Sequence, residues 1–394
     1  MIEELHMTSL RLLFLSILKL GASAYGGPGM ISQIKETAIN RYGWVKEGEF
    51  MRGVALCQLI PGAIMVHIVT YIGYRVRGIW GALTAAVAFV LPAFVALLAL
   101  SAIYFKFHGL WFMESIFKGL GAIVIAILLN ACITFGKSVL KDWKVILISV
   151  FSFFAILFHL NIVLIFVLAA VAGLLLHPET VQAKALPPEA PCQGTGEEKP
   201  RLILLALATC IAVVLGLCYL IDPRIAHVSL GFSKIGVVAF GAFTAIPLIQ
   251  HDMVDGLHWL STKEFLDGIA LGCVTPGPIM ITATFVGYKV AGFWGASMAT
   301  LGVFFPSFFI LVLLIPYHDR LREVAKVRMM EQGVLGAFIG ILALVLYNFG
   351  RTSLIDVQSI LMALGAFIAI YKKISLPYIL LVGVILSIIF WGLK

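Results

Sequence analysis

The stretch Gln58–Met65 reads QLIPGAIM and lies inside an apolar run that extends from Val54 to Tyr71. Pro and Gly are the residues least compatible with a helix interior, because Pro cannot donate a backbone hydrogen bond and Gly leaves the backbone free. A second stretch, Cys273–Met280, reads CVTPGPIM and carries the same Pro-Gly pair. We therefore predict that two apolar segments of this chain are broken helices.

The composition of the 394-residue chain is that of a membrane protein. Hydrophobic residues make up 61% of it and charged residues 12%, whereas soluble domains carry about 25% charged residues. The net charge of +8 is spread over short loops, which favours positive-inside topology over binding to nucleic acid. The six Cys residues show no metal-ligand spacing, and we expect neither a metal nor a cofactor.

Apolar segments of about the length that crosses a bilayer recur along nearly the whole chain. We predict thirteen, at about residues 8–25, 52–72, 79–105, 116–136, 144–158, 161–176, 202–221, 229–249, 266–287, 291–316, 330–349, 356–371 and 375–393. The region 177–200 is rich in Pro, Gly and Glu, and we interpret it as a polar linker.

The chain is an internal duplication. We align the second half of the chain with the first at an offset of 215 residues, which becomes 214 after one deletion. Trp, Glu, Pro, Gly and Asp residues then coincide, and chance similarity between apolar segments would not align these residue types. The matched pairs include Trp44 with Trp259, Glu49 with Glu264, Pro61 with Pro276, Gly62 with Gly277, Gly78 with Gly292, Pro92 with Pro306 and Asp142 with Asp356.

We divide the chain into a first repeat, 1–176, the linker 177–200, an extra span, 201–221, and a second repeat, 222–394. Six spans return a chain to its starting side and the extra span moves it across, so the second repeat begins on the opposite face. The predicted fold is an all-α polytopic membrane protein with two inverted-topology repeats of about six transmembrane segments, broken helices and one extra linking span. Such repeats with substrate between them are a common plan of secondary transporters.

The paired breaks at Pro61–Gly62 and Pro276–Gly277 are our first candidate site. In hydrocarbon, freed backbone groups are tolerated where protein or a watery cavity satisfies them. A helix that restarts after the break points its N–H groups and its positive dipole end at the membrane midplane, which suits an anion. The alternative is a proline kink that serves packing.

Two further features extend this candidate anion site. A second helix break is predicted upstream, at Gly26, Gly27 and Pro28. At the equivalent position the second repeat has Gly241 but lacks the Gly-Pro pair. Lys19 and its counterpart Lys234 lie two residues before equivalent glycines, and a pair of cations inside the membrane would bind a small dianion. The alternative for both lysines is snorkelling to an interface.

Four other polar residues accompany the second spans. Gln58 precedes the first break by one turn and could donate its amide to a ligand. Glu49 and Glu264 lie at the span starts, where they cap helices or carry protons, and Ser261 gives Glu264 the spacing of a capping box. His67 could titrate near neutrality or be a hydrogen-bonded interior residue.

The order of these motifs resembles the chromate transporter family of bacterial inner-membrane proteins, in its long two-domain form. The resemblance rests on Tyr25–Pro28, Trp44, the Ala-Leu-x-Gln-x-x-Pro-Gly pattern of Ala55–Gly62 and, in the second repeat, Thr275–Pro278. It covers nearly the whole chain outside the linker and the extra span. The resemblance implies export of chromate, an oxyanion similar to sulfate, and hence chromate resistance.

The residues contain no enzyme motif, so we expect a transporter in the lipid bilayer rather than an enzyme. The leading hypothesis is export of chromate or a sulfate-like oxyanion. The alternatives are a proton-coupled importer of sulfate or a small organic anion, and an anion channel. A homodimer is left open.

Overall fold

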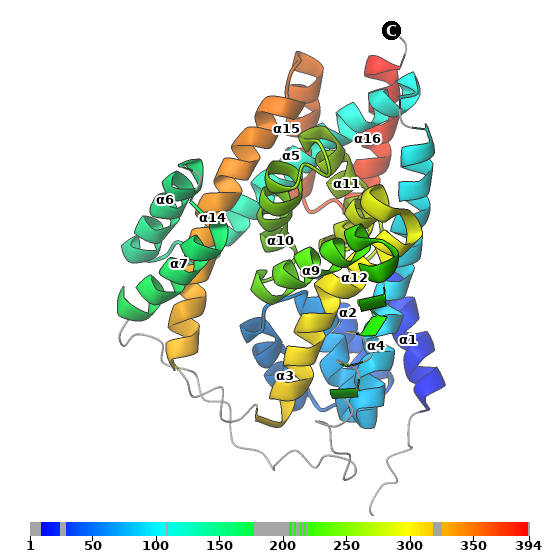
Figure 1. Ribbon diagram of the computed structural model, residues 1–394, viewed down its shortest axis with the longest axis vertical. Coiled ribbons are helices and arrows are strands. Elements are labelled where there is room, and N and C mark those ends of the chain that lie inside the picture. The colour runs from blue at the N-terminus through cyan, green and yellow to red at the C-terminus, as the bar shows by residue number, and fades with distance from the viewer. Residues whose placement is uncertain are drawn as a thin grey trace, which may run out of the picture. The chain divides into compact units, whose positions relative to one another are not determined.

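The computed structural model describes residues 9–23, 29–107, 109–158, 160–176, 219–317 and 325–392, with isolated positions between 205 and 217. The expected linker 177–200 lies outside these residues, as does most of the extra span 201–221. The described residues are helical and contain no β-strand, which confirms the all-α fold class. The elements (Figure 1) are α1 Leu10–Ser23, α2 Gly29–Lys35, η1 Glu36–Arg41, α3 Glu47–Leu59, α4 Ile64–Phe107, α5 Trp111–Val139, α6 Trp143–Leu157, α7 Ile162–Leu176, α9 Pro223–Val238, α10 Ala242–Ile249, η2 Gln250–Gly256, α11 Thr262–Val274, η3 Ile279–Ile281, α12 Thr282–Leu314, η4 Ile315–Tyr317, α14 Ala325–Ser353, α15 Val357–Tyr371 and α16 Leu376–Trp391.

The helix breaks predicted at the two Pro-Gly pairs are confirmed. The segment expected at 52–72 is not one helix, since α3 ends at Leu59 and α4 begins at Ile64. In the second repeat α11 ends at Val274, and a short 3-10 turn precedes α12. Each break contains a glycine with positive φ, +125° at Gly62 and +116° at Gly277, a backbone conformation that other residues adopt only with strain.

The two sequence repeats have the same secondary structure. At the repeat offsets of 215 and 214, α3 coincides with α11, α5 with α14 and α6 with α15 from first to last residue. The two π-helices, η1 and η2, also fall at matched positions. The internal duplication predicted from sequence therefore extends to the backbone.

The long apolar helices α4 and α12 turn back at equivalent glycines. Gly78 and Gly292 have φ of +59° and +57°, which interrupts each helix. The two arms of α4 then cross so closely that a Cβ added to Gly73 would lie 2.3 Å from the Gly81 carbonyl oxygen. The same crossing recurs in α12. In membranes such close approach of backbones depends on small residues.

By length and composition, four described helices are able to cross a membrane: Ile64–Phe107, Trp111–Val139, Ile279–Leu314 and Met329–Ser353. Four more apolar helices, α6, α7, α15 and α16, have 15 or 16 residues. The described count is below the thirteen segments that we predicted. α4 covers residues of two predicted segments, one on each side of the turn at Gly78, and α12 does the same at Gly292. The Pro-Gly breaks shorten other segments, and most of 201–221 lies outside the described residues.

The described chain forms two compact units. The first contains residues 1–98, 185–241 and 275–322, and the second contains 99–184, 242–274 and 323–394. Neither unit coincides with a sequence repeat, since each takes segments from both.

Within the first unit, each repeat packs against the other in a reciprocal way. A Cβ added to Gly62 would lie 2.5 Å from the Ser307 Cβ, and one added to Gly277 would lie 2.9 Å from the Ala93 Cβ. Ser307 and Ala93 are equivalent residues, each directly after the proline of its long helix. Paired contacts of this kind are the mark of a two-fold relation between two similar parts.

Within the second unit, the equivalent helices α5 and α14 run antiparallel. Gly121, near the start of α5, faces Ser353 at the end of α14, where an added Cβ would lie 3.4 Å from the Ser353 Oγ. Farther along α5, the Phe135 ring lies 6.2 Å from the Phe338 ring near the middle of α14. The packing is again reciprocal, since α14 packs on α6 and α7 of the first repeat (Figure 1) and α5 packs on α15 and α16 of the second.

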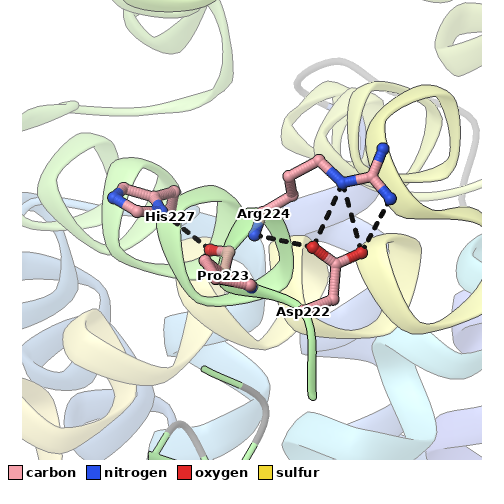
Figure 2. Close-up of polar contacts among 4 residues, drawn as sticks. All are labelled: Asp222, Pro223, Arg224 and His227. Atoms are coloured by element: carbon pink, nitrogen blue, oxygen red, sulfur yellow. Dashed lines mark hydrogen bonds and ion pairs between the residues drawn. The ribbon is translucent and has the colours of Figure 1, made fainter. Parts of the chain in front are cut away.

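The start of α9 is fixed by its first residues. Asp222 accepts a hydrogen bond from the Arg224 backbone at 2.9 Å and pairs with the Arg224 guanidinium, also at 2.9 Å, while the His227 ring lies 2.7 Å from the Pro223 carbonyl (Figure 2). The hydrogen bonds from Arg224 lower the pKa of Asp222 below its usual value. This N-cap, with Pro at the first helical position, fixes the start of the helix that carries Lys234.

Candidate functional site

The first Pro-Gly break is hydrogen-bonded to residues 239–241 of the second repeat, the segment between α9 and α10. The Gly62 amide donates a hydrogen bond to the Ala239 carbonyl at 2.6 Å, and the Gly241 amide donates to the Gly62 carbonyl at 2.9 Å. These bonds form an isolated parallel bridge between Gly62 and Phe240. We call residues 61–62 and 239–241 the Gly62 junction. It brings together two residues that the sequence assigned to the site, Gly62 and Gly241.

Glycine is needed at the junction for two reasons. Gly62 and Gly241 both have positive φ, +125° and +90°. A side chain on Gly62 would also collide with its surroundings, because an added Cβ would lie 2.6 Å from the Ser307 Oγ and 2.7 Å from the His67 Nε2. The backbone, the hydroxyl and the imidazole therefore converge on one point.

His67 is the least satisfied polar side chain at this point. It is 1% exposed, and neither ring nitrogen has a hydrogen-bond partner in the part of the chain that the structure describes. The backbone of Cys57 is the polar group that interacts with the ring. Whether His67 titrates or serves as a hydrogen-bonded interior residue stays a prediction. Buried polar groups almost always have a partner, so an unsatisfied imidazole points to a ligand or water.

The junction also presents a helix N-terminus. α4 begins at Ile64, two residues after Gly62, and the N–H groups of its first turn have no acceptor within the helix. The His67 amide is the first that bonds back, to the Ala63 carbonyl at 3.0 Å. Free N–H groups and a positive dipole end are the features that suit an anion.

The two candidate lysines lie on equivalent helices of the first unit. Lys19 is exposed in the last turns of α1, and Lys234 is exposed one turn before the end of α9. Both helices lie against the long helices, since an added Cβ on Gly21 or Gly236 would strike the backbone of α4 or α12. Their role as anion ligands stays a prediction.

The remaining candidates are placed as follows. Gln58 is exposed in the last turn of α3, and Pro61 and Pro276 are half-buried within the breaks. Pro278 is the N-cap of η3, and its carbonyl accepts a hydrogen bond from the Ile281 amide at 2.9 Å. The upstream break at Gly26, Gly27 and Pro28 lies outside the described residues.

The two candidate glutamates have different local roles. Glu49 forms an ion pair with Arg75 of α4, and both side chains are largely covered. Glu264 forms the capping box that its spacing predicts, since its carboxylate accepts from the Ser261 amide at 2.9 Å and its own amide donates to the Ser261 Oγ at 3.1 Å. A proton-carrying or gating role for either stays a prediction.

Sequence reasoning missed two residues of the second unit, Asp267 and Tyr104. The Tyr104 hydroxyl donates a hydrogen bond to the Asp267 carboxylate at 2.7 Å, although the two residues are far apart in the chain. A signal existed, because Asp267 lies within an apolar segment, where an ionisable residue is by default functional. Ser307 was also missed, and its contact with Gly62 depends on packing between the repeats.

Groups of three or more His, Cys, Asp or Glu side chains able to hold a metal ion do not occur among the described residues.

Comparison with known proteins gives matches over both repeats. The sequence profile described as "Chromate transporter" matches residues 11–174 and 226–388. An uncharacterised transporter of Methanocaldococcus jannaschii is 35% identical over 95% of this chain and 93% of its own length. The chromate transport protein of Cupriavidus metallidurans is 31% identical over 98% and 94%, and a probable chromate transport protein of Synechococcus elongatus is 30% identical over 98% and 96%. No solved structure matches.

Proposed function

Because this chain belongs to the chromate transporter family, we propose that it is a secondary transporter that exports an inorganic oxyanion, with chromate as the first candidate and sulfate as the second. The chain is a multi-pass membrane protein, and its family points to a transporter rather than an enzyme. Relatives named as chromate transport proteins match along nearly their whole length. We further propose that it resides in a bacterial inner membrane and confers chromate resistance.

The Gly62 junction is the observation that carries this proposal. Chromate and sulfate are tetrahedral dianions with acceptor oxygens only, so their site needs N–H donors and positive charge. The junction offers the first turn of α4, the His67 ring, which has no hydrogen-bond partner among the described residues, and glycine backbone that admits close approach. Lys19 and Lys234 supply the charge that a dianion requires after it loses its water.

Inverted topology of the two repeats is part of the proposal. The antiparallel course of α5 and α14, which are equivalent helices, supports it. So do the reciprocal contacts of Gly62 with Ser307 and of Gly277 with Ala93. Two repeats related in this way expose one site alternately to either side.

Outward transport follows from the charge of the substrate. One elementary charge that crosses 100 mV gains about 2.3 kcal/mol, so a dianion that leaves a negative interior gains about twice that amount. Export therefore proceeds without an obligatory co-ion, whereas uptake of the same dianion needs protons or sodium.

The test is chromate efflux from proteoliposomes that contain the full chain, under an imposed inside-negative potential. We expect Lys19→Ala and Lys234→Ala each to slow efflux about tenfold or more, because each removes a charge-assisted contact. Lys141→Ala is the matched control, since Lys141 is exposed in the turn between α5 and α6. Efflux unchanged in both variants would overturn the assignment of this site.

The same vesicles separate export from the competing hypothesis of proton-coupled import. Export driven by potential alone continues in the presence of a protonophore when a potassium gradient holds the potential. Uptake that collapses under these conditions, and that Glu49→Gln abolishes, would replace the proposal by the importer.

A further inference from the structure

A cavity of about 750 Å³ lies in the second unit, and we call it the α5 cavity. Its wall is formed by the first turns of α5 and α11 and the last turns of α14 and α16, and it includes Trp111, Lys118 and Trp391. Trp and Lys at helix ends are typical of the membrane–water interface. We therefore expect the mouth of this cavity to face water at one membrane surface.

Asp267 is part of the wall of the α5 cavity. It lies in the middle of α11 and is 4% exposed. Its Oδ2 accepts the Tyr104 hydroxyl hydrogen at 2.7 Å. A buried carboxylate is costly unless it is compensated, and acidic residues that face water-filled cavities inside membranes mark proton pathways.

Lys263 attracts the Asp267 carboxylate electrostatically, but neither lysine of the cavity wall forms an ion pair with it among the described residues. Lys118 pairs with Asp356 at 2.7 Å, and Lys263 lies 4.0 Å from Glu114. The titratable and charged groups on α11 itself and on the elements packed against it include Lys263, Glu264 and Cys273 of α11, Tyr104 of α4, Glu114, Lys118, Cys132 and Lys137 of α5, Glu331, Tyr347 and Arg351 of α14, Tyr378 of α16, and His251, Asp252 and Asp255 of η2.

We propose that Asp267 is a proton-binding residue that is reached through the α5 cavity, and that its protonation is linked to oxyanion transport. In this step the carboxylate takes one proton from water in the cavity and becomes a neutral acid, and no other bond changes. The reverse step returns the proton to water. The link to transport rests on the proposed function, whereas proton binding does not.

The chain itself connects the Tyr104–Asp267 pair to both Pro-Gly breaks. α11 carries Asp267 and ends directly before Pro276–Gly277, while α4 starts directly after Gly62 and carries Tyr104 toward its end. Proton uptake converts the acceptor of the Tyr104 hydrogen bond from a carboxylate into an acid, and so weakens a charge-assisted bond between these two helices. The bond therefore joins α11, which precedes the second break, to the arm of α4 that follows the turn at Gly78.

The first experiment measures proton binding without any transported anion. The full chain is reconstituted in lipid and titrated with acid while the carboxylic-acid C=O band is followed by infrared difference spectroscopy. We expect one component of this band to belong to Asp267, so that Asp267→Asn removes it. The control variant Glu47→Gln keeps this component, because the Glu47 side chain is 68% exposed and does not belong to the cavity wall. A spectrum of Asp267→Asn that keeps every titrating component of the wild-type band would overturn the proposal.

A second variant guards against loss of fold. Tyr104→Phe removes the hydroxyl that stabilises the charged carboxylate, and a hydrogen bond to a charged group corresponds to about one pH unit or more. We expect the midpoint of the titration to rise by that amount. A midpoint that does not move would overturn the pairing of Tyr104 with the titrating group.

The third experiment measures transport in proteoliposomes with chromate as the probe. We expect wild-type efflux to change with pH, and Asp267→Asn to carry out chromate exchange without that pH dependence. Wild-type vesicles that bind protons but move no chromate would contradict the proposed function and leave proton binding intact. Efflux of Asp267→Asn that keeps the wild-type pH profile would overturn the linkage.

Discussion

The Gly241 amide donates a hydrogen bond to the Gly62 carbonyl at 2.9 Å, and this bond joins a break in the first repeat to a break in the second. Both glycines have positive φ. The junction therefore depends on two residues without side chains that come from different repeats. These hydrogen bonds explain why the backbone has a defined structure at Gly62 and Gly241, where the helices are interrupted.

Substitution of the junction glycine tests this dependence. Gly62→Ala is expected to lower stability by about 1–3 kcal/mol from backbone strain alone, with a further loss from contact with Ser307 and His67. The measurement is the thermal unfolding temperature of the detergent-solubilised chain. Gly365→Ala is the matched control, because an added Cβ there meets nothing within 4 Å, and equal melting of the two variants would contradict the strain at Gly62.

Equivalent glycines at the helix crossings are expected to respond alike. A Cβ on Gly73 would lie 2.3 Å from the Gly81 carbonyl oxygen, and one on Gly287 would lie 2.2 Å from the Gly295 carbonyl oxygen. Gly73→Ala and Gly287→Ala therefore force the arms of α4 and α12 apart, and we expect losses of about 1–3 kcal/mol each. Thermal unfolding measures both, with Gly350→Ala as the control at an open position. A large loss in one variant and none in the other would contradict the shared fold of the repeats.

The ion pair between Glu49 and Arg75 separates a structural role from a proton-carrying role. Arg75→Gln alone leaves a largely covered carboxylate without this partner, which is costly, whereas Arg75→Gln with Glu49→Gln removes both charges. We expect the double variant to unfold at a higher temperature than Arg75→Gln. If the double variant also transports chromate, Glu49 is structural. A double variant less stable than Arg75→Gln would show that the pair is not the main contribution of Glu49.

Stability is expected to depend on pH through Asp356, which caps α15 and lies outside the membrane segments. Partial burial opposes its charge, yet hydrogen bonds from Lys118, Ser359 and Trp391 lower the pKa of Asp356 well below its usual value. A lowered pKa stabilises the fold above the usual Asp value of about 4, and this contribution is lost as the pH falls through the folded-state value.

Asp356→Asn tests this dependence, because Asn retains the capping ability and removes the charge. We expect a loss of about 1 kcal/mol at neutral pH, a small value because the pair is partly exposed. The difference from wild type should shrink as the pH falls below about 4. Denaturation measured at several pH values checks this result, and a difference that stays constant with pH would assign the loss to packing alone.

The sequence by itself determined the class of the protein. Its apolar fraction excludes a soluble domain, and the aligned Trp, Glu, Pro and Gly residues reveal a duplication whose helix boundaries the structure reproduces. The breaks at Gly62 and Gly277 were also predictable, because the backbone limits of Pro and Gly act within a few residues. The same local chemistry predicted the capping box of Ser261 and Glu264.

Only the tertiary structure decided which parts meet. Nothing local relates Gly62 to Ala239, Gly277 to Ala93 or Tyr104 to Asp267, because each contact arises from packing between segments that the chain separates widely. For the same reason the sequence could not show that His67 is buried with no hydrogen-bond partner among the described residues, since satisfaction of a side chain depends on its neighbours in space. The apolar pattern places helices in a membrane, while their close packing at glycines selects the pairs that form a site.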